Sequence, residues 1–565
     1  MTVYDQMGLV LLLLLHNLGH MQRIIVLYKW LPFDGLSTHT MGVLLFVLEL
    51  NTMMKSTLSY FSRSLRFLAG LIAFHFHSFF IQLCYLMILS LVGYLGLKVS
   101  KPRNPVRLND LDLFYTSVSA STASSMVAVE MEVFSNSQLI LFTLLMFLGG
   151  EVFTSMLDLL FAGYKLQNKV SINPFPPTNH ANQIELGLVL SIPHSDSENH
   201  NPCDSNIINV ASCDRLKYNC LSYLTYAVLG YLVMVQFVGF SFVSLYMTLV
   251  PSARQVLKNK GIKIVTFSLF TVVSTFASCG FVPTNENMIV FKKNSGLLLL
   301  ILPHVFLGNA LYPPCLRLLI MVLKKVTKKE EFSYLLKNSI DVGYEHLLSD
   351  LRCCFLVATV LGFNLIQFVM LCSLEWKTKI MEGLNVYEKV VASLFQVTNA
   401  RHAGESVFDL SSISSAILVL FVVMMYLPPY TTFLPVREHE KDVNKRNEKS
   451  VVECLVLSQL SYLVIFIILI CITESKSLKE DPLNFNSSGK ELTSFLDAYG
   501  NVGFSTGYSC ARQLKTDATC KDSWVGFSGR WSSKGKFILI LVMFFGRLKK
   551  FNMKGGKAWK LSWPV

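Results

Sequence analysis

The chain has 565 residues, of which 52% are hydrophobic and only 15% are charged, and its mean hydropathy is +0.47. Soluble proteins carry roughly 25% charged residues, so this composition excludes an ordinary soluble multidomain protein. The net charge of +13 does not indicate a nucleic-acid-binding protein, because the basic residues cluster at the ends of apolar runs. The thirteen cysteines form no CxxC pair, so no zinc or redox site is indicated.

The first 52 residues do not fit the pattern of the rest. Residues 11–15 form a short apolar run that follows Asp5, without the basic region of a signal peptide. This run is too short to span a bilayer. We expect an extension, non-native or disordered, or else a targeting segment or an interfacial helix, with the first structural unit starting near Met53.

Eight apolar runs follow, and each is long enough for a membrane-crossing helix. They are residues 67–97, 137–163, 219–250, 296–323, 353–375, 411–434, 451–473 and 533–552. Between the members of each pair lies a shorter stretch rich in Ser, Thr, Phe and Asn, which is typical of a re-entrant helix and loop buried in protein. These stretches are residues 111–124, 264–279, 386–403 and 490–502.

The chain is therefore predicted to be an all-α polytopic membrane protein with four units of helix, re-entrant segment and helix. The predicted units are residues 53–163, 218–325, 353–434 and 451–565, the last including a short cytoplasmic tail. Cytoplasmic connections are predicted at residues 164–217, 326–352 and 435–450, the first as a flexible linker. Because basic residues gather in these connections and in the tail, both termini are expected in the cytoplasm. Lys98, Lys101, Arg103 and Arg107 are the exception to this rule.

Each re-entrant segment ends in serine or glycine at an equivalent place, namely Ser125, Gly280, Gly404 and Gly503. Small residues let the backbone approach an ion and bend around it, and carbonyl oxygens from several sides can replace the ion's hydration shell. Four such segments in one polypeptide indicate a four-fold pore made by a single chain. The residues expected to flank this filter are Thr122, Ser124, Ser278, Cys279, Asn501 and Val502.

The four segments resemble those of the plant high-affinity potassium transporter (HKT) family, within the Trk/Ktr superfamily. The matching stretches are residues 117–126, 274–287, 399–405 and 498–508, and the similarity runs from about Met53 to the C-terminus. The resemblance implies one filter residue per unit, at Ser125, Gly280, Gly404 and Gly503. The Ser-Gly-Gly-Gly set is similar to that of the first, mainly sodium-selective subfamily, because a serine can narrow or disrupt one ring of carbonyl oxygens.

Other candidate residues have two interpretations each. Glu130, Glu132, Glu286 and Glu405 are either an outer ring that attracts cations or solvated and structural carboxylates, the latter as partners of Arg401. Arg547, Lys549 and Lys550 either approach the pore below the filter, as a basic residue of this helix does in related transporters, or extend to the cytoplasmic interface. Pro428-Pro429 either shapes a constriction or ends a helix, and Gly149-Gly150 is either a hinge or a close helix crossing.

Two features are expected on the outer face. Asn486 begins an N-glycosylation sequon, and Cys510 and Cys520 could form a disulfide in an oxidising space. His75 and His77 lie two residues apart and so face different sides of a helix, which makes a metal pair improbable.

The function expected from these features is passive sodium transport across the plasma membrane, which would contribute to sodium homeostasis and salt tolerance. The alternatives are a sodium–potassium symporter or mixed channel of the same fold, an inverted-repeat carrier, or a membrane-embedded enzyme. No Walker A loop and no HExxH motif is present, so we expect no enzyme and no cofactor. The expected partners are Na⁺, with K⁺ as the alternative, held by filter carbonyls, together with the lipid bilayer and a second copy in a homodimer. Nucleic acid is not among them.

Overall fold

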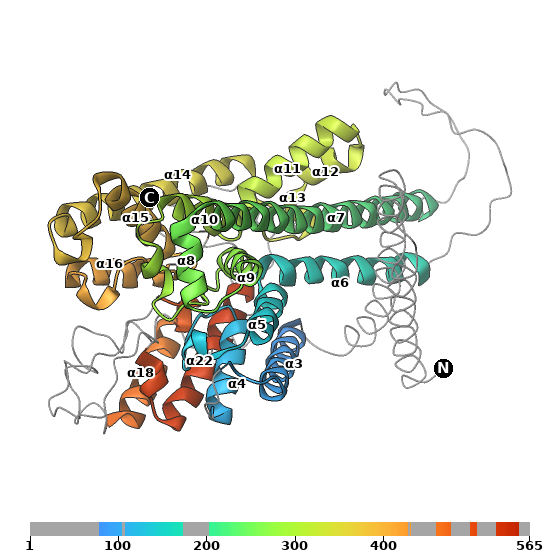
Figure 1. Ribbon diagram of the computed structural model, residues 1–565. Helices are drawn as coiled ribbons and strands as arrows, with labels where there is room; N and C mark the ends of the chain where they lie inside the picture. Colours follow the sequence, from blue (N-terminus) through green and yellow to red (C-terminus); the bar gives the residue numbers. More distant parts are fainter. Residues whose placement is uncertain are drawn as a thin grey trace, which may run out of the picture. The chain divides into compact units, whose positions relative to one another are not determined.

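The computed structural model describes residues 78–103, 108–172, 203–427, 430, 459–475, 498–504 and 527–552, and these residues form α-helices joined by turns and short 3₁₀ helices (Figure 1). The predictions for residues 1–52, His75, His77, Asn486, Cys510 and Cys520 lie outside them, as do those for Pro428-Pro429 and the side chains of Lys549 and Lys550. The predicted domain boundaries stay predictions.

Four units of helix, short segment and helix follow one another along the chain. The first is α3 (Ser78–Val99), α4 (Asp110–Ser121) and α5 (Asn136–Gly149), and the second is α7 (Cys203–Leu249), α9 (Ile264–Phe276) and α10 (Ser295–Leu307). The third is α14 (Asp350–Glu375), α15 (Val386–Asn399) and α16 (Ser415–Tyr426). The fourth is α18 (Gln459–Thr473), residues 498–504 and α22 (Ser533–Asn552). The all-α polytopic fold predicted from the sequence is thus confirmed.

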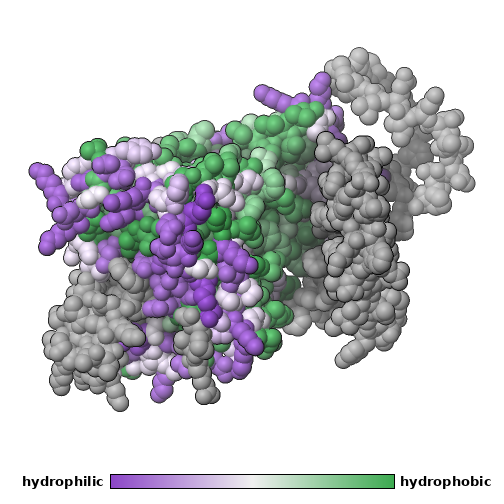
Figure 2. Space-filling view, in the orientation of Figure 1, coloured by the Kyte–Doolittle hydropathy of each residue, from purple (hydrophilic) through white to green (hydrophobic). Residues whose placement is uncertain are grey.

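The outward faces of the long helices are apolar. On α3 the side chains of Ile88, Val92 and Leu95 recur at helical spacing and are 61%, 56% and 57% exposed. Leu361 and Leu365 on α14 are exposed in the same way. In Figure 2, hydrophobic side chains gather on part of the visible face, beside a hydrophilic region. Such stripes are unfavourable in water and favourable in lipid, as expected of a multi-pass membrane protein.

The second helix of the first two units is broken, and the sequence interpretation raised only the first of these breaks, as the hinge alternative at Gly149-Gly150. The described residues contain three helices long and apolar enough to cross a membrane, or up to five if each bent pair is one span. Helix α5 meets α6 (Glu151–Ile172) at 50°, and α10 meets α11 (Tyr312–Thr327) at 80°. The membrane-crossing helices predicted at 137–163 and 296–323 are therefore bent pairs in the structure. Glycines at the two breaks let the backbone approach a neighbouring segment closely.

Helices also extend into the predicted connections. Helix α6 continues to Ile172 and α7 begins at Cys203, so both ends of the predicted flexible linker at 164–217 are helical. The connection predicted at 326–352 contains the short helices α12 (Glu330–Lys337) and α13 (Ser339–Val342). The amphipathic helix α8 (Pro251–Asn259) follows α7 and was not predicted.

The four units close into a ring. The first meets the second where α5 packs on α9, the second meets the third where α10 packs on α15, and the fourth meets the first where α22 packs on α4. The third and fourth units meet through the aromatic rings of Phe421 and Phe504, whose centroids are 5.3 Å apart. A partly buried ion pair of 2.6 Å between Lys536 on α22 and Asp112 on α4 also joins the fourth unit to the first. This closure brings the ends of the four short segments together.

Candidate functional site

The short helices stop just before the four candidate filter positions. Helices α4 and α9 end four residues before Ser125 and Gly280, and α15 ends five residues before Gly404. The chain then folds back on the helix end, where the Ser124 N–H donates to Ser119 O and the Cys279 N–H donates to Ser274 O, both at 2.9 Å. These bonds satisfy backbone groups that neither water nor lipid can reach.

All four candidate positions have a left-handed backbone. The φ angles of Ser125, Gly280, Gly404 and Gly503 are 52°, 79°, 77° and 83°. A second residue with positive φ lies two positions earlier in three segments, at Ala123, Ser278 and Asn501. Glycine adopts this conformation without steric cost, whereas serine does not. The shared backbone shape explains why glycine stands at three positions and makes Ser125 the strained one.

The four positions lie against one another in cyclic order. A Cβ built on Gly280 would lie 1.6 Å from Ala403 O, and one built on Gly404 would lie 1.9 Å from Val502 O. A Cβ on Gly503 would lie 2.0 Å from Ser125 Cβ and 3.2 Å from Cys279 O. The second segment thus touches the third, the third touches the fourth, and the fourth touches the first. Carbonyl oxygens of the residues that precede the filter glycines converge here, where they could replace the water around a cation.

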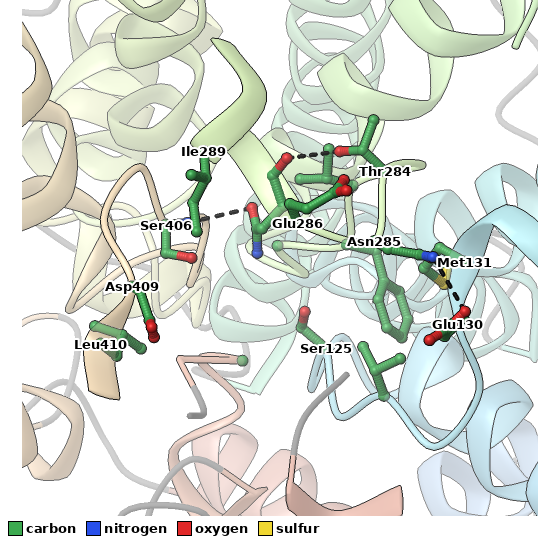
Figure 3. Close-up of a pocket in the computed structure, with 16 residues that line it drawn as sticks. Ser125, Glu130, Met131, Thr284, Asn285, Glu286, Ile289, Ser406, Asp409 and Leu410 are labelled. Carbon is green, nitrogen blue, oxygen red and sulfur yellow. Dashed lines mark hydrogen bonds between the residues drawn. The ribbon is translucent and has the colours of Figure 1, made fainter. Parts of the chain in front are cut away.

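A cavity of about 70 Å³ opens beside this ring. Ser125, Gly280 and Gly503 line it, together with residues that follow the filter positions (Figure 3). Its volume exceeds the roughly 10–15 Å³ that a single water requires. Its carboxylates are Glu130, Glu286 and Asp409. The cavity therefore combines a polar, acidic mouth with the backbone of the ring.

The predicted outer carboxylates separate into two groups. Glu130 and Glu286 line the cavity, and Glu132 lies next to it, paired with a lysine. Glu405 is completely buried and accepts a hydrogen bond from Thr275 Oγ1 at 2.5 Å. The prediction that Glu405 belongs to an outer ring is therefore wrong, because its carboxylate points into the protein and joins the third unit to the second.

Sequence reasoning missed Asp409, whose carboxylate lines the cavity from the third unit. Its side chain accepts bonds from the N–H and the hydroxyl of Ser411, at 2.9 and 2.8 Å, so its orientation is held locally. A signal was present in the sequence, because Asp409 follows Gly404 by five residues, as Glu130 follows Ser125 and Asn285 follows Gly280.

Two buried asparagines join the filter segments. Asn501 Nδ2 in the fourth segment donates to Ser124 Oγ in the first at 2.5 Å, and Ser124 Oγ lies 2.7 Å from Thr122 Oγ1. Asn309, which follows α10, donates from Nδ2 to Ser278 Oγ at 2.9 Å and to His402 O at 3.4 Å. The polar flanking residues therefore hold the segments in register, while Cys279 and Val502 are buried in apolar packing. Asn309 lies outside the short segments, so local patterns did not reveal it.

Glycines bring the second helices onto the ends of the re-entrant segments. A Cβ on Gly149 would lie 1.9 Å from Ser121 O, one on Gly308 would lie 1.8 Å from Phe276 O, and one on Gly546 would lie 2.3 Å from Tyr499 O. Each contacted residue precedes its filter position by four. Gly149 therefore lies at a close helix crossing, and it also ends the straight part of its helix at the 50° bend. The hinge interpretation of Gly149-Gly150 stays a prediction.

Arg547 follows the third of these glycines and is only 1% exposed. Its Nη2 donates to the carbonyl of Gly149, so a cation of the fourth unit reaches the break in the first. Of the two interpretations of this residue, extension to the cytoplasmic interface is wrong, because the guanidinium is enclosed by protein. The structure places it beside the helix break that supports the first filter segment.

Comparisons with known proteins show which family this chain is similar to. Residues 211–553 match the family TrkH, described as a cation transport protein. The chain is 47% identical over 489 residues to the rice cation transporter HKT1;3, covering 85% of this chain and 91% of that protein. It is 49% identical over 479 residues to the Arabidopsis thaliana sodium transporter HKT1, covering 82% and 92%. The solved potassium transporter TrkH from Vibrio parahaemolyticus aligns over 84% of this chain and 83% of its own, with 14% identity and a TM-score of 0.45.

Proposed function

Because this chain belongs to the TrkH cation transport family and to its plant HKT members, we propose that it conducts Na⁺ passively through the ring formed by Ser125, Gly280, Gly404 and Gly503. It is a transporter and not an enzyme. The ion would leave its hydration shell in the acidic cavity and exchange water for backbone carbonyl oxygens as it enters the ring. The electrochemical gradient alone would then drive it through.

One observation supports sodium as the preferred ion. Ser125 is the only filter position with a side chain, and its Oγ lies at the ring, 2.6 Å from where a Cβ of Gly503 would be. The Cβ and hydroxyl take space that would otherwise be open to the ion. K⁺ must shed its hydration water to pass a ring of carbonyls, so it loses more from this asymmetry than the smaller Na⁺ does.

The sidedness and the membrane are further parts of the proposal. The acidic cavity would face outward, where its carboxylates raise the local cation concentration. Both termini would lie in the cytoplasm, as the basic residues of the connections indicate. The membrane would be the plasma membrane. We also propose a homodimer, as the resemblance to the Trk/Ktr superfamily implies. Each copy would hold one complete pore, because all four filter segments belong to a single chain.

Voltage-clamp recording in oocytes that express the full chain tests this function. With Na⁺ and K⁺ exchanged in the bath, the reversal potential should follow external Na⁺ with a slope near 59 mV per tenfold change and should respond weakly to K⁺. Equal responses to the two ions would instead support a mixed cation channel. Currents that need both ions at once would support a symporter.

A further inference from the structure

Lys260 lies beside the cavity mouth and contacts two units at once. It follows α8, and its Nζ lies 2.5 Å from Glu132 Oε1 and 2.6 Å from Glu286 Oε2. Glu132 belongs to the loop after the first filter segment, and Glu286 to the loop after the second. The side chains are 16%, 25% and 28% exposed, so the contacts are partly shielded from solvent. One ammonium therefore neutralises carboxylates from two filter loops.

The surrounding hydrogen bonds hold this arrangement in place. The Asn285 N–H donates to Glu132 Oε1 at 3.0 Å. Asn285 Nδ2 donates to Glu130 Oε2 at 3.2 Å (Figure 3). The Glu132 N–H returns a bond to Asn285 Oδ1 at 3.1 Å. On the other side, Arg103 Nη1 donates to the Lys260 carbonyl at 2.6 Å. Lys260 is thus fixed from its backbone to its ammonium.

The lysine keeps its charge under physiological conditions. Burial lowers the pKa of Lys260, but the hydrogen bonds and charges of Glu132 and Glu286 raise it by more, so its pKa lies above the ordinary 10.5. A raised pKa means that the ammonium is fully charged at neutral pH and loses its charge only in strong alkali. The cavity mouth therefore holds a permanent positive charge, the Lys260 ammonium. Glu130 and Asp409, which line the cavity together with Glu286, form no ion pair with this ammonium.

We propose that Lys260 is a specificity-determining residue of the pore mouth. Its ammonium forms ion pairs with Glu132 and Glu286 and so limits how strongly these carboxylates bind external cations. This inference rests on the proposed transport function. With the lysine in place, Na⁺ meets a mouth acidic enough to attract it. Divalent cations, which are drawn twice as strongly by any given potential, do not lodge there and block the pore.

Lys260→Gln tests the proposal because it removes the charge and keeps most of the side chain. We expect the external Na⁺ concentration that gives half-maximal current to fall by roughly threefold, within the range that charged clefts produce. A potential that concentrates Na⁺ threefold concentrates Ca²⁺ by its square, so the Ca²⁺ concentration for half block should fall by roughly ninefold. Both shifts should shrink at high ionic strength, because the carboxylates are screened.

Two control variants isolate the charge at this position. Lys258→Gln removes the same charge from an exposed site on α8, two residues earlier, and should change neither value. Lys260→Arg keeps the positive charge and should leave Ca²⁺ block within twofold of the parent. Parallel changes in Lys258→Gln would mean that overall charge, and not these ion pairs, sets the mouth potential, which overturns the proposal.

Carboxylate variants test the same pairs from the other side. The double variant Glu132→Gln/Glu286→Gln leaves the Lys260 ammonium without its two carboxylate partners. Adding Lys260→Gln removes this unpaired charge and should return the half-saturating Na⁺ concentration toward the parent value. Glu286→Gln alone should weaken Ca²⁺ block, which keeps the test open if Lys260→Gln fails to reach the surface. The proposal is overturned if Lys260→Gln changes surface expression but neither concentration. A parent protein without Na⁺ current would instead contradict the proposed function.

Discussion

The side chain of Ser125 fills the place that a side chain at position 503 would need. A Cβ on Gly503 would lie 2.0 Å from Ser125 Cβ and 2.6 Å from its Oγ. The two residues come from the first and last filter segments, which are 378 positions apart but adjacent in the ring. The ring therefore has room for one side chain at this junction. The four backbones have similar φ angles, but only the first position carries a side chain.

Ser125→Gly should raise the permeability of K⁺ relative to Na⁺. It removes the one side chain at the ring and also relieves a serine held at φ 52°, a strain of order 1 kcal/mol. A selectivity change of about 1 kcal/mol would alter the permeability ratio roughly fivefold. The reversal potential under exchanged Na⁺ and K⁺ would then move by roughly 40 mV. Unchanged selectivity with normal currents would rule out the serine as the origin of sodium preference.

Ser124→Ala should act on folding more than on selectivity. The Ser124 hydroxyl accepts from Asn501 Nδ2 and also bonds Thr122, so its loss leaves a buried amide without that partner. Such a loss costs roughly 1–3 kcal/mol. We expect lower surface expression, measured by surface biotinylation, with the parent's permeability ratio in the channels that remain. If Ser124→Ala changed selectivity more than Ser125→Gly, the filter register would be displaced by one residue.

Gly404→Ala should abolish current. Its Cβ would lie 1.9 Å from Val502 O, and the residue has φ 77°, so both contact and backbone conformation oppose a side chain. The matched control is Gly230→Ala on α7, where no atom lies within 4 Å and alanine stabilises a helix by about 0.5–1 kcal/mol. Currents should be recorded alongside surface amounts. Full Na⁺ current in Gly404→Ala would show that the third segment does not form the ring.

Asn309→Ala should lower the selectivity for Na⁺ over K⁺ without placing a new side chain in the pore. Its amide holds Ser278 of the second segment and the His402 carbonyl of the third, so its loss frees two segments at once. We expect the ratio of K⁺ to Na⁺ permeability to rise and thermal stability in detergent to fall. Asn259→Ala, at the end of the surface helix α8, provides the control and should alter neither. If stability fell but the ratio of K⁺ to Na⁺ permeability stayed at the parent value, Asn309 would stabilise the fold without affecting selectivity.

Most of the transport architecture was readable in the sequence. The helical class follows from local pattern, because membrane-crossing helices need long apolar runs. The four candidate filter positions were predicted in the same way, because a close backbone approach needs glycine or serine. The structure adds that the glycine positions share a left-handed φ, which explains why that residue type is required there. Gly308 and Gly546 were missed because a glycine inside an apolar run gives no sign of what it contacts.

The sequence by itself determined which residues could line a pore, and only the tertiary structure decided which of them lie at the cavity beside the ring. Glu405 and Glu130 are both carboxylates a few residues beyond a filter position, yet the first is buried against Thr275 and the second lines the cavity. Lys260 joins Glu132, 128 positions away, because ring closure brings the loops of two units together. Charge and side-chain type are local properties of the chain, whereas burial and pairing depend on contacts between distant segments, which the local pattern does not specify.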